Sequence, residues 1–248
     1  MALVKTAYLK EIEFPSGTIK FNYSEKESSF YGNAMPEVWK NFDEKTYCLD
    51  SISVYSKLEL VTDISFDYEY YSSGNNGYRM YLQSLNNNGK KYLFNYQGLS
   101  SLPNPLTSGI DLWGYYNGMN SNSILLPRFS SDLQGIPNPF NVDVQFRKTN
   151  PTYNNIGMLS EITYPTGGKT QFTFETHDYN TVLRRTENTG MQPSQENEFG
   201  YAGGTRIKQV KNIPGETINY YYKTNFTKND TIGNNSSGIL IDNFINFI

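Results

Sequence analysis

His177 sets the limit on acid–base chemistry, because it is the one histidine of the chain. A Ser–His or Cys–His catalytic pair would have to use this imidazole, and the adjacent Asp178 offers a carboxylate that could orient it as a base. No Gly-x-Ser-x-Gly elbow accompanies it. A hydrolase centred on His177 therefore stays an alternative, beside the simpler interpretation of a histidine that caps the end of a strand.

Metal and nucleotide binding have little support. A structural zinc site takes about four nitrogen or sulfur ligands, and Cys48 is the one cysteine. The carboxylates Asp111, Asp132, Asp143 and Asp230 lack the spacing of a calcium loop. No two of the 24 acidic residues stand out as a pair for glycoside hydrolysis, and no glycine-rich phosphate loop occurs. We expect no metal, no cofactor and no catalytic residue.

The best candidate for ligand binding is the aromatic stretch Trp113-Gly-Tyr-Tyr-Asn-Gly118. Exposed aromatic rings can stack on the faces of sugar rings, while a neighbouring amide bonds the hydroxyl groups. Trp113, Tyr115, Tyr116 and Asn117 are the candidate binding residues, and the ligand would be a glycan. The alternative interpretation is a loop whose rings cover the end of a sheet.

The elements that must position these side chains come from a repeated pattern. Leu9–Gly17 and Leu159–Gly167 share the pattern Leu-x-Glu-Ile-x-aromatic-Pro-Ser/Thr-Gly, and an alternating run that ends in aromatic residues follows each copy. Alternation at period two predicts a strand with one buried and one solvent face. The Pro-Ser/Thr-Gly step predicts a hairpin turn. Glu11 and Glu161 hold equivalent positions, which favours a structural role such as pairing with a lysine across the hairpin.

Weaker copies extend the repeat along the chain. Asn88-Gly89 is a strong signal for a hairpin turn, and Pro214-Gly215 marks another turn. A looser copy between Leu49 and Tyr70 lacks a Pro or Gly turn. We expect hairpins near residues 9–23, 49–70, 82–96, 159–174 and 207–222.

These hairpins predict an all-β chain, with repeated antiparallel hairpins in one extended, twisted sheet that forms a single domain over residues 1–248. Enrichment in Pro, Gly, Asn and Ser predicts long packed loops at 97–156 and 187–204. It also predicts a mobile tail at 228–248, whose apolar end from Ile239 onward could add a strand or a short helix.

Composition supports this class and argues against others. Aromatic residues make up 15% of the chain, and Tyr and Phe favour pleated, half-buried surfaces. The net charge of −3 argues against nucleic-acid binding, which needs a basic face. No apolar run reaches the roughly 18 residues of a membrane span, and the polar N-terminus lacks the features of a signal peptide. Unpaired sheet edges would allow self-association.

Four stretches resemble the Rhs/YD-repeat class of bacterial surface proteins, most closely the divergent Rhs-like proteins of Bacteroidetes. They are Leu159–Phe174 with His177-Asp-Tyr179, Asp111–Gly118, Gly203–Val210 and Ser236–Leu240. The resemblance implies hairpins paired into a continuous sheet, a place at the cell surface or outside the cell, and a non-catalytic role as scaffold or shell. Members of the class are longer and some enclose a toxin, whereas this sequence has no Rhs core motif and no toxin domain. The resemblance therefore implies a fragment whose partner is the remainder of a larger surface protein.

Overall fold

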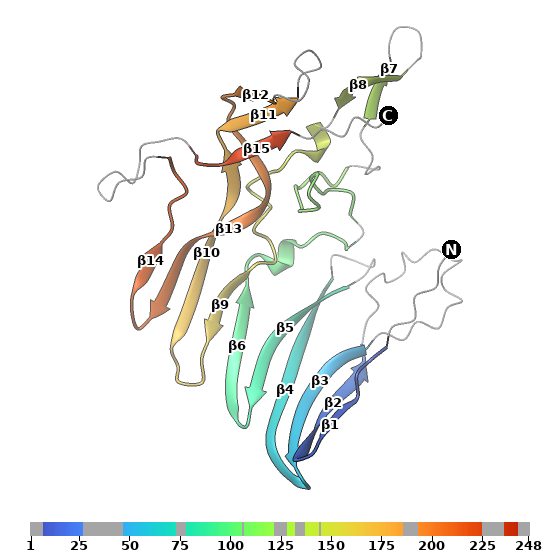
Figure 1. The fold of residues 1–248 in the computed structure, drawn as a ribbon, viewed down its shortest axis with the longest axis vertical. Coiled ribbons are helices and arrows are strands. Elements are labelled where there is room, and N and C mark those ends of the chain that lie inside the picture. The colour runs from blue at the N-terminus through green and yellow to red at the C-terminus, as the bar shows by residue number, and fades with distance from the viewer. Residues whose placement is uncertain are drawn as a thin grey trace. The chain divides into compact units, whose positions relative to one another are not determined.

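The structure, a computed structural model, describes residues 7–26, 47–72, 78–105, 107–121, 128–131, 137–143, 145–185, 193–224 and 236–242. Its regular structure is almost entirely β-strand, and no α-helix occurs among these residues. The all-β expectation is confirmed, because neighbouring strands pair as antiparallel hairpins in a sheet that is not closed into a barrel (Figure 1).

Ten strands form the main sheet, in the order β1-β2-β3-β4-β5-β6-β9-β10-β13-β14. Since β1 and β14 stand at the two ends of this order, each has one edge that pairs with no other strand of the sheet. The strands are β1 (Glu11–Phe14), β2 (Gly17–Glu25), β3 (Tyr47–Ser56), β4 (Glu59–Ser72), β5 (Tyr78–Asn87), β6 (Lys90–Tyr96), β9 (Leu159–Thr163), β10 (Lys169–Tyr179), β13 (Gly200–Ile213) and β14 (Thr217–Asn219).

Two smaller sheets account for the other strands. β11 (Thr181–Arg185) pairs antiparallel with β12 (Pro193–Glu196) and parallel with β15 (Ile239–Asp242). β7 (Arg128–Ser131) pairs with β8 (Pro137–Asp143). Two short 3₁₀ turns, η3 (Leu99–Ser101) and η4 (Gln145–Arg147), complete the described elements.

Both predicted loops contain strands. Within 97–156 the structure has β7 and β8, and within 187–204 it has β12 and the start of β13. The prolines of β8 had argued against a strand, but proline is tolerated at the edges of sheets, and a two-stranded sheet consists of edges only. Of the strand or short helix expected from Ile239 onward, the structure has a strand, β15, so Ile239–Asp242 within the tail predicted as mobile at 228–248 have regular structure. Residues 225–235 and 243–248 lie outside the described part.

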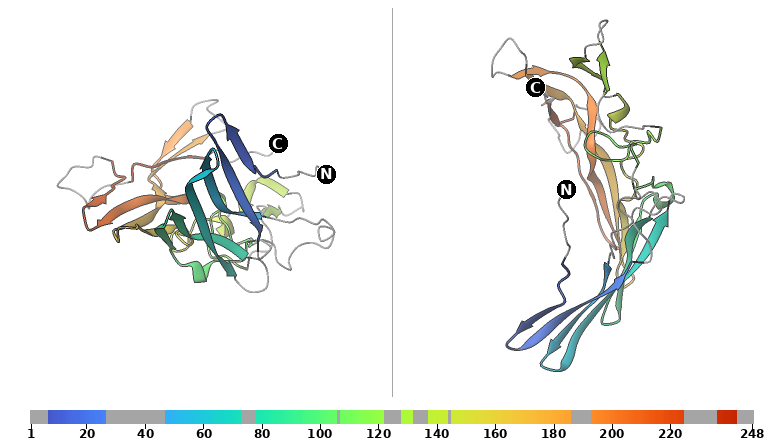
Figure 2. Two further views of the ribbon diagram at one scale, coloured as in Figure 1. Left: turned by 90° about the horizontal axis from the view of Figure 1, so that it is seen from below. Right: turned by 90° about the vertical axis from the view of Figure 1, so that its right-hand side faces the viewer.

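Close contacts divide the chain into two compact units. The first comprises Met1–Pro105 and Leu159–Thr170, and the second comprises Leu106–Met158 and Gln171–Ile248. Within the first unit, Figure 2 shows strands β2 to β6 as a single curved layer. The expectation of one repeat-built domain stays a prediction.

All five expected hairpins occur, and their turns explain why the loose copy was hard to recognise. The turn between β5 and β6 has positive φ at both Asn88 (49°) and Gly89 (82°), as a two-residue hairpin turn requires. In the loose copy, Lys57 adopts a φ of 57° at the corresponding turn. A lysine rarely adopts this left-handed conformation, so the sequence carried no turn signal there.

The pairing expected for the repeat glutamates is present in one copy. Lys169 Nζ lies 2.7 Å from Glu161 Oε1 across the β9–β10 hairpin. In the first copy, Glu11 lies opposite Lys20 in the register of β1 and β2. The two glutamates therefore hold equivalent places in their hairpins, which supports a structural role for Glu161.

A tyrosine hydroxyl ties together the start and the end of four hairpins. In each, a tyrosine late in the unit donates a hydrogen bond to the backbone carbonyl of the Leu or Ile that opens it, and we call this contact the tyrosine clasp. The four clasps are Tyr23 to Leu9 (3.1 Å), Tyr68 to Leu49 (2.8 Å), Tyr96 to Leu82 (2.8 Å) and Tyr222 to Ile207 (2.9 Å). The loose copy thus shares a contact with the clear ones. In the unit that begins at Leu159, Phe174 stands at the corresponding position and has no hydroxyl to donate.

Replacing Tyr68 by phenylalanine is expected to lower the free energy of unfolding by about 0.5–1.5 kcal/mol, the net contribution of one hydrogen bond. Burial raises the pKa of Tyr68, with further contributions from Cys48 and Asp50, so its hydroxyl stays a donor at neutral pH. Denaturant unfolding measures the change. Tyr92→Phe is the matched control, because this hydroxyl makes no hydrogen bond to the described residues while its ring packs edge-on against Tyr164. Equal losses in the two variants would contradict the clasp.

The described residues bury little apolar surface. Their buried hydrophobic side chains are Cys48 and Val182, whereas large ones on the strands are exposed, such as Leu60 at 52% and Val61 at 55% on β4. Domains normally stabilise a sheet by packing its apolar face against a second layer. The described part of the sheet therefore presents apolar surface that it does not itself cover.

Candidate functional site

The carboxylate of Asp111 organises the aromatic loop of the second unit. Asp111 is completely buried. Its Oδ1 accepts hydrogen bonds from the backbone N–H groups of Trp113 (3.0 Å) and Tyr115 (2.9 Å), and its Oδ2 accepts one from the Thr149 hydroxyl (2.8 Å). The Arg147 guanidinium donates to the backbone carbonyl of Asp111 at 2.7 Å. These contacts fix the backbone that carries the aromatic side chains.

Asn117 is a second internal support, although the sequence placed it among the ligand-binding candidates. Its side chain is 1% exposed. The amide nitrogen donates to the carbonyls of Phe146 (2.9 Å) and Lys148 (3.1 Å), and the amide oxygen accepts from the N–H of Met119 (3.1 Å). The donors and the acceptor of this side chain are thus engaged within the loop, so Asn117 positions the loop instead of facing solvent.

The rings of Trp113 and Tyr115 lie against the glycine pair of β13. A methyl group at Gly203 would lie 2.4 Å from Trp113 Cβ, and one at Gly204 would lie 3.1 Å from the Tyr115 hydroxyl oxygen. Trp113 and Tyr115 as whole residues nevertheless stay 47% and 40% exposed, respectively. This packing supports the interpretation that the loop covers part of a sheet. Glycan binding by the exposed faces of the two rings stays a prediction.

Tyr116, the third aromatic candidate, packs within the loop region. Its ring meets Tyr153 edge to face at 5.3 Å between centroids, and its hydroxyl accepts a hydrogen bond from the Asn120 amide at 2.9 Å. The candidate residues are therefore close together, but Tyr116 and Asn117 have partners inside the protein.

His177 lies on β10 and is half-buried. Among the described residues its imidazole forms no hydrogen bond or ion pair, and the adjacent Asp178 bonds to Arg206 and Ser236 instead. Over the same part of the chain no three His, Cys, Asp or Glu side chains gather as metal ligands. The oriented imidazole that the hydrolase alternative requires is not formed in this geometry.

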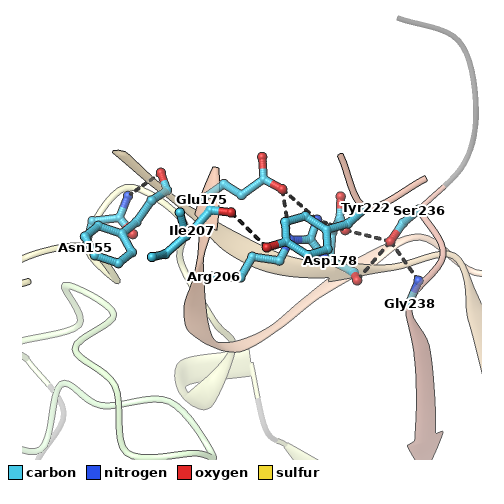
Figure 3. A network of polar contacts seen from close by, with 9 residues as sticks. Asn155, Glu175, Asp178, Arg206, Ile207, Tyr222, Ser236 and Gly238 are labelled. Atoms are coloured by element: carbon cyan, nitrogen blue, oxygen red, sulfur yellow. Dashed lines mark hydrogen bonds and ion pairs between the residues drawn. The ribbon is translucent and has the colours of Figure 1, made fainter. Parts of the chain in front are cut away.

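Arg206 on β13 bridges two carboxylates of β10 (Figure 3). Its Nη2 lies 2.8 Å from Glu175 Oε1 and 2.7 Å from Asp178 Oδ1. The guanidinium also lies over the Tyr222 ring, 4.1 Å from the centroid, and the hydroxyl of this tyrosine makes the last tyrosine clasp, to Ile207. Arg206 thus combines two ion pairs with a cation–π contact.

Ser236 attaches the C-terminal segment to this network. Its hydroxyl donates to Asp178 Oδ1 at 2.6 Å, approaches the Asp178 carbonyl at 3.0 Å, and accepts a hydrogen bond from the N–H of Gly238 at 3.0 Å. The Asn180 N–H donates to the Gly238 carbonyl at 3.1 Å. These contacts lead directly into β15, so Asp178 helps to set the position of that strand.

The pKa of Asp178 is lowered in the folded protein. Burial alone would raise it, but the hydrogen bonds from Ser236 and Arg206 and the positive charges of Arg206 and Lys223 outweigh burial. A carboxyl whose pKa is lower in the folded than in the unfolded state stabilises the fold above its unfolded pKa, and the stabilisation is lost as pH falls through the folded value. Asp178 therefore contributes to stability at neutral pH and loses that contribution below about pH 4.

We expect Asp178→Asn to flatten the acid side of the stability curve. Unfolding midpoints in denaturant at several pH values between about 2 and 6 measure this effect. The wild type should lose more stability than the variant as pH falls through the lower half of that range. Asp63→Asn is a matched control, because Asp63 accepts from Ser53 at 2.7 Å in another hairpin and has no arginine partner among the described residues. Parallel curves for the wild type and Asp178→Asn would contradict the assignment.

The network brings together stretches that the sequence analysis had treated separately. Asp178, Arg206 and Ser236 belong to three of the four stretches that carry the family resemblance, and Trp113, from the fourth, packs on Gly203. The sequence offered no spacing signal for the ion pairs, because Asp178 and Arg206 stand 28 residues apart and Asp178 and Ser236 stand 58 apart.

In the described part of the chain, no helix has the length and apolar character needed to cross a membrane. Comparisons of the chain with models of protein families, with characterised proteins and with solved structures find no match.

Proposed function

We propose that the chain is a non-catalytic structural segment, a scaffold or shell, of an exported cell-surface protein similar to the Rhs/YD-repeat class. The observation that carries the proposal is that one or more residues from each of the four resembling stretches are joined by contacts in the second unit. Asp178, Arg206 and Ser236 meet there through charged hydrogen bonds, and Trp113 lies on Gly203. Motifs that serve the fold are expected to contact one another in this way.

The limited apolar core supports a place within a larger body. A sheet that leaves Ile12, Phe14 and Leu60 exposed gains stability when another layer covers it. The remainder of a larger surface protein would supply that layer. The fold also engages the polar side chains that could do chemistry, since Asp111, Asp178 and Arg206 are all bonded internally.

Surface proteolysis of intact cells that encode the chain tests the location and the larger body together. Trypsin should release peptides of this chain from intact cells. An antibody against the chain should detect a polypeptide that is longer than 248 residues. Peptides that appear only after lysis, together with a species of 248 residues alone, would overturn the proposal.

A second experiment tests the absence of catalysis. Purified protein and the His177→Ala variant are compared on chromogenic ester, peptide and glycoside substrates. We expect both proteins to match the buffer rate. Turnover by the wild type that His177→Ala abolishes would establish the hydrolase alternative instead.

A further inference from the structure

One face of β4, β5 and β6 in the first unit carries an open cavity of about 200 Å³. Aromatic side chains make up half of its lining residues, and one carboxylate and two amides are among the others. The residues that matter here are Glu69, Tyr71, Tyr81, Gln83, Phe94 and Tyr96. None of them was a binding candidate in the sequence, because the cavity draws on three strands and has no local motif.

The strand period explains how these side chains meet. Glu69 and Tyr71 are two residues apart on β4, and Tyr81 and Gln83 are two apart on β5, so each pair points to one face of the sheet. The register places Glu69 directly opposite Tyr81. Cross-strand neighbours on one face lie close enough for their side chains to touch.

The aromatic wall is held in place by its own contacts. The ring of Tyr81 meets Tyr71 edge to face at 5.9 Å and Tyr96 at 4.8 Å between centroids. The hydroxyl of Tyr96 makes the tyrosine clasp to Leu82 at 2.8 Å. A wall that is already ordered loses little side-chain entropy when a ligand binds.

The polar groups of the cavity keep capacity for further hydrogen bonds. Gln83 Nε2 donates to Glu69 Oε2 at 3.0 Å. The hydrogen bond with Glu69 raises the pKa of Tyr71, with smaller contributions from burial and from the Glu69 charge, so the phenol stays protonated. A carboxylate offers about four acceptor positions and an amide oxygen offers two, so Glu69 and Gln83 can still accept hydrogen bonds from a bound molecule.

We propose that this cavity binds one neutral sugar ring, such as the terminal pyranose of a glycan. Aromatic faces suit the C–H face of a sugar, while Glu69 and Gln83 suit its hydroxyl groups. The cavity is smaller than the roughly 300–1,000 Å³ of pockets for drug-sized ligands, which fits a single ring. The Glu69 carboxylate disfavours acidic sugars, because two like charges repel. This binding goes beyond the scaffold role and does not depend on it.

The test is a titration of the purified chain with methyl glucoside, methyl galactoside, methyl mannoside, N-acetylglucosamine and glucuronate, followed by saturation-transfer NMR. We expect at least one neutral sugar to bind, and glucuronate to bind at least tenfold more weakly. The proposal would be overturned if none of the neutral sugars, at millimolar concentration, received saturation from the protein. Tighter binding of glucuronate would also overturn it.

Two matched pairs of variants locate the site. Gln83→Ala should weaken binding about fivefold to tenfold, whereas Gln209→Ala should not, although Gln209 makes a similar exposed cross-strand hydrogen bond to Asn219 (2.8 Å). Tyr71→Ala should weaken binding at least tenfold, whereas Tyr220→Ala should leave it unchanged. Circular dichroism checks that each variant is folded. Sugar binding that survives both Gln83→Ala and Tyr71→Ala would exclude this cavity, and sensitivity to Trp113→Ala alone would assign it to the aromatic loop.

Discussion

Replacing Asp111 by alanine is expected to disorder the aromatic loop and to lower the free energy of unfolding by about 3–5 kcal/mol. The substitution leaves the N–H groups of Trp113 and Tyr115 and the hydroxyl of Thr149 without their shared acceptor. Each buried polar group that loses its partner costs about 1–3 kcal/mol. The loss stays below the sum of the largest values because water can enter a loop whose rings are partly exposed.

Asp111→Asn is the control, since it has the same shape and keeps one oxygen for the two N–H groups. We expect this variant to retain most of the stability and the native position of the Trp113 indole N–H cross-peak in NMR spectra. In Asp111→Ala the cross-peak should move toward the value of an exposed tryptophan. An unchanged cross-peak in Asp111→Ala would show that the carboxylate does not hold the loop.

Replacing Arg206 by alanine is expected to cost about 2–4 kcal/mol and to release β15 from its place beside β11. Removing one partner of a buried ion pair costs about 3–5 kcal/mol, because the other charge stays buried alone. The side chain of Asp178 is 15% exposed, but that of Glu175 is 30% exposed, so solvent screening reduces the cost. The variant also loses the cation–π contact with Tyr222.

Hydrogen exchange of the backbone amides measures both effects, together with denaturant unfolding. Amides of β10, β13 and β15 should exchange faster in Arg206→Ala, whereas those of β2 to β6 should keep their protection. The exchange rates and the stability of Arg206→Lys should lie between those of the wild type and of Arg206→Ala. A lysine keeps the charge but cannot make the paired hydrogen bonds of the guanidinium. Arg79→Ala controls for the loss of an arginine, since Arg79 donates one long hydrogen bond, to the Pro103 carbonyl at 3.4 Å. Equal costs for Arg206→Ala and Arg79→Ala would contradict the bridging role.

The hairpins could be predicted because their information is local. Alternation and turn residues lie within about 15 residues of one another, and this was sufficient for the copies at Leu9, Leu82, Leu159 and Ile207. The strand at Gly200–Gly204 could not be predicted in this way, because glycine normally weakens a strand. In the structure these glycines make room for aromatic rings, from Tyr179 at Gly200 to Trp113 at Gly203. The ring that needs the space comes from elsewhere in the chain.

The candidate site could be predicted only in part, because contacts between residues far apart in the sequence decide which of its side chains are buried. The sequence identified the aromatic stretch, but it could not distinguish the exposed faces of Trp113 and Tyr115 from the buried amide of Asn117. Burial of Asn117 depends on the carbonyls of Phe146 and Lys148, about 30 residues away. A cavity that assembles from three strands, such as the one beside Tyr81, leaves no local pattern to recognise.

The tyrosine clasps have a consequence for the order of folding during synthesis. Each clasp joins residues 14 to 19 positions apart. Contacts between residues so close in the sequence form fast. A hairpin can therefore close soon after its last residue leaves the ribosome. The bond from Ser236 to Asp178 spans 58 residues and must wait for the C-terminal segment. The N-terminal hairpins can thus fold one at a time as the chain grows, whereas β10 and β13 await their final partner.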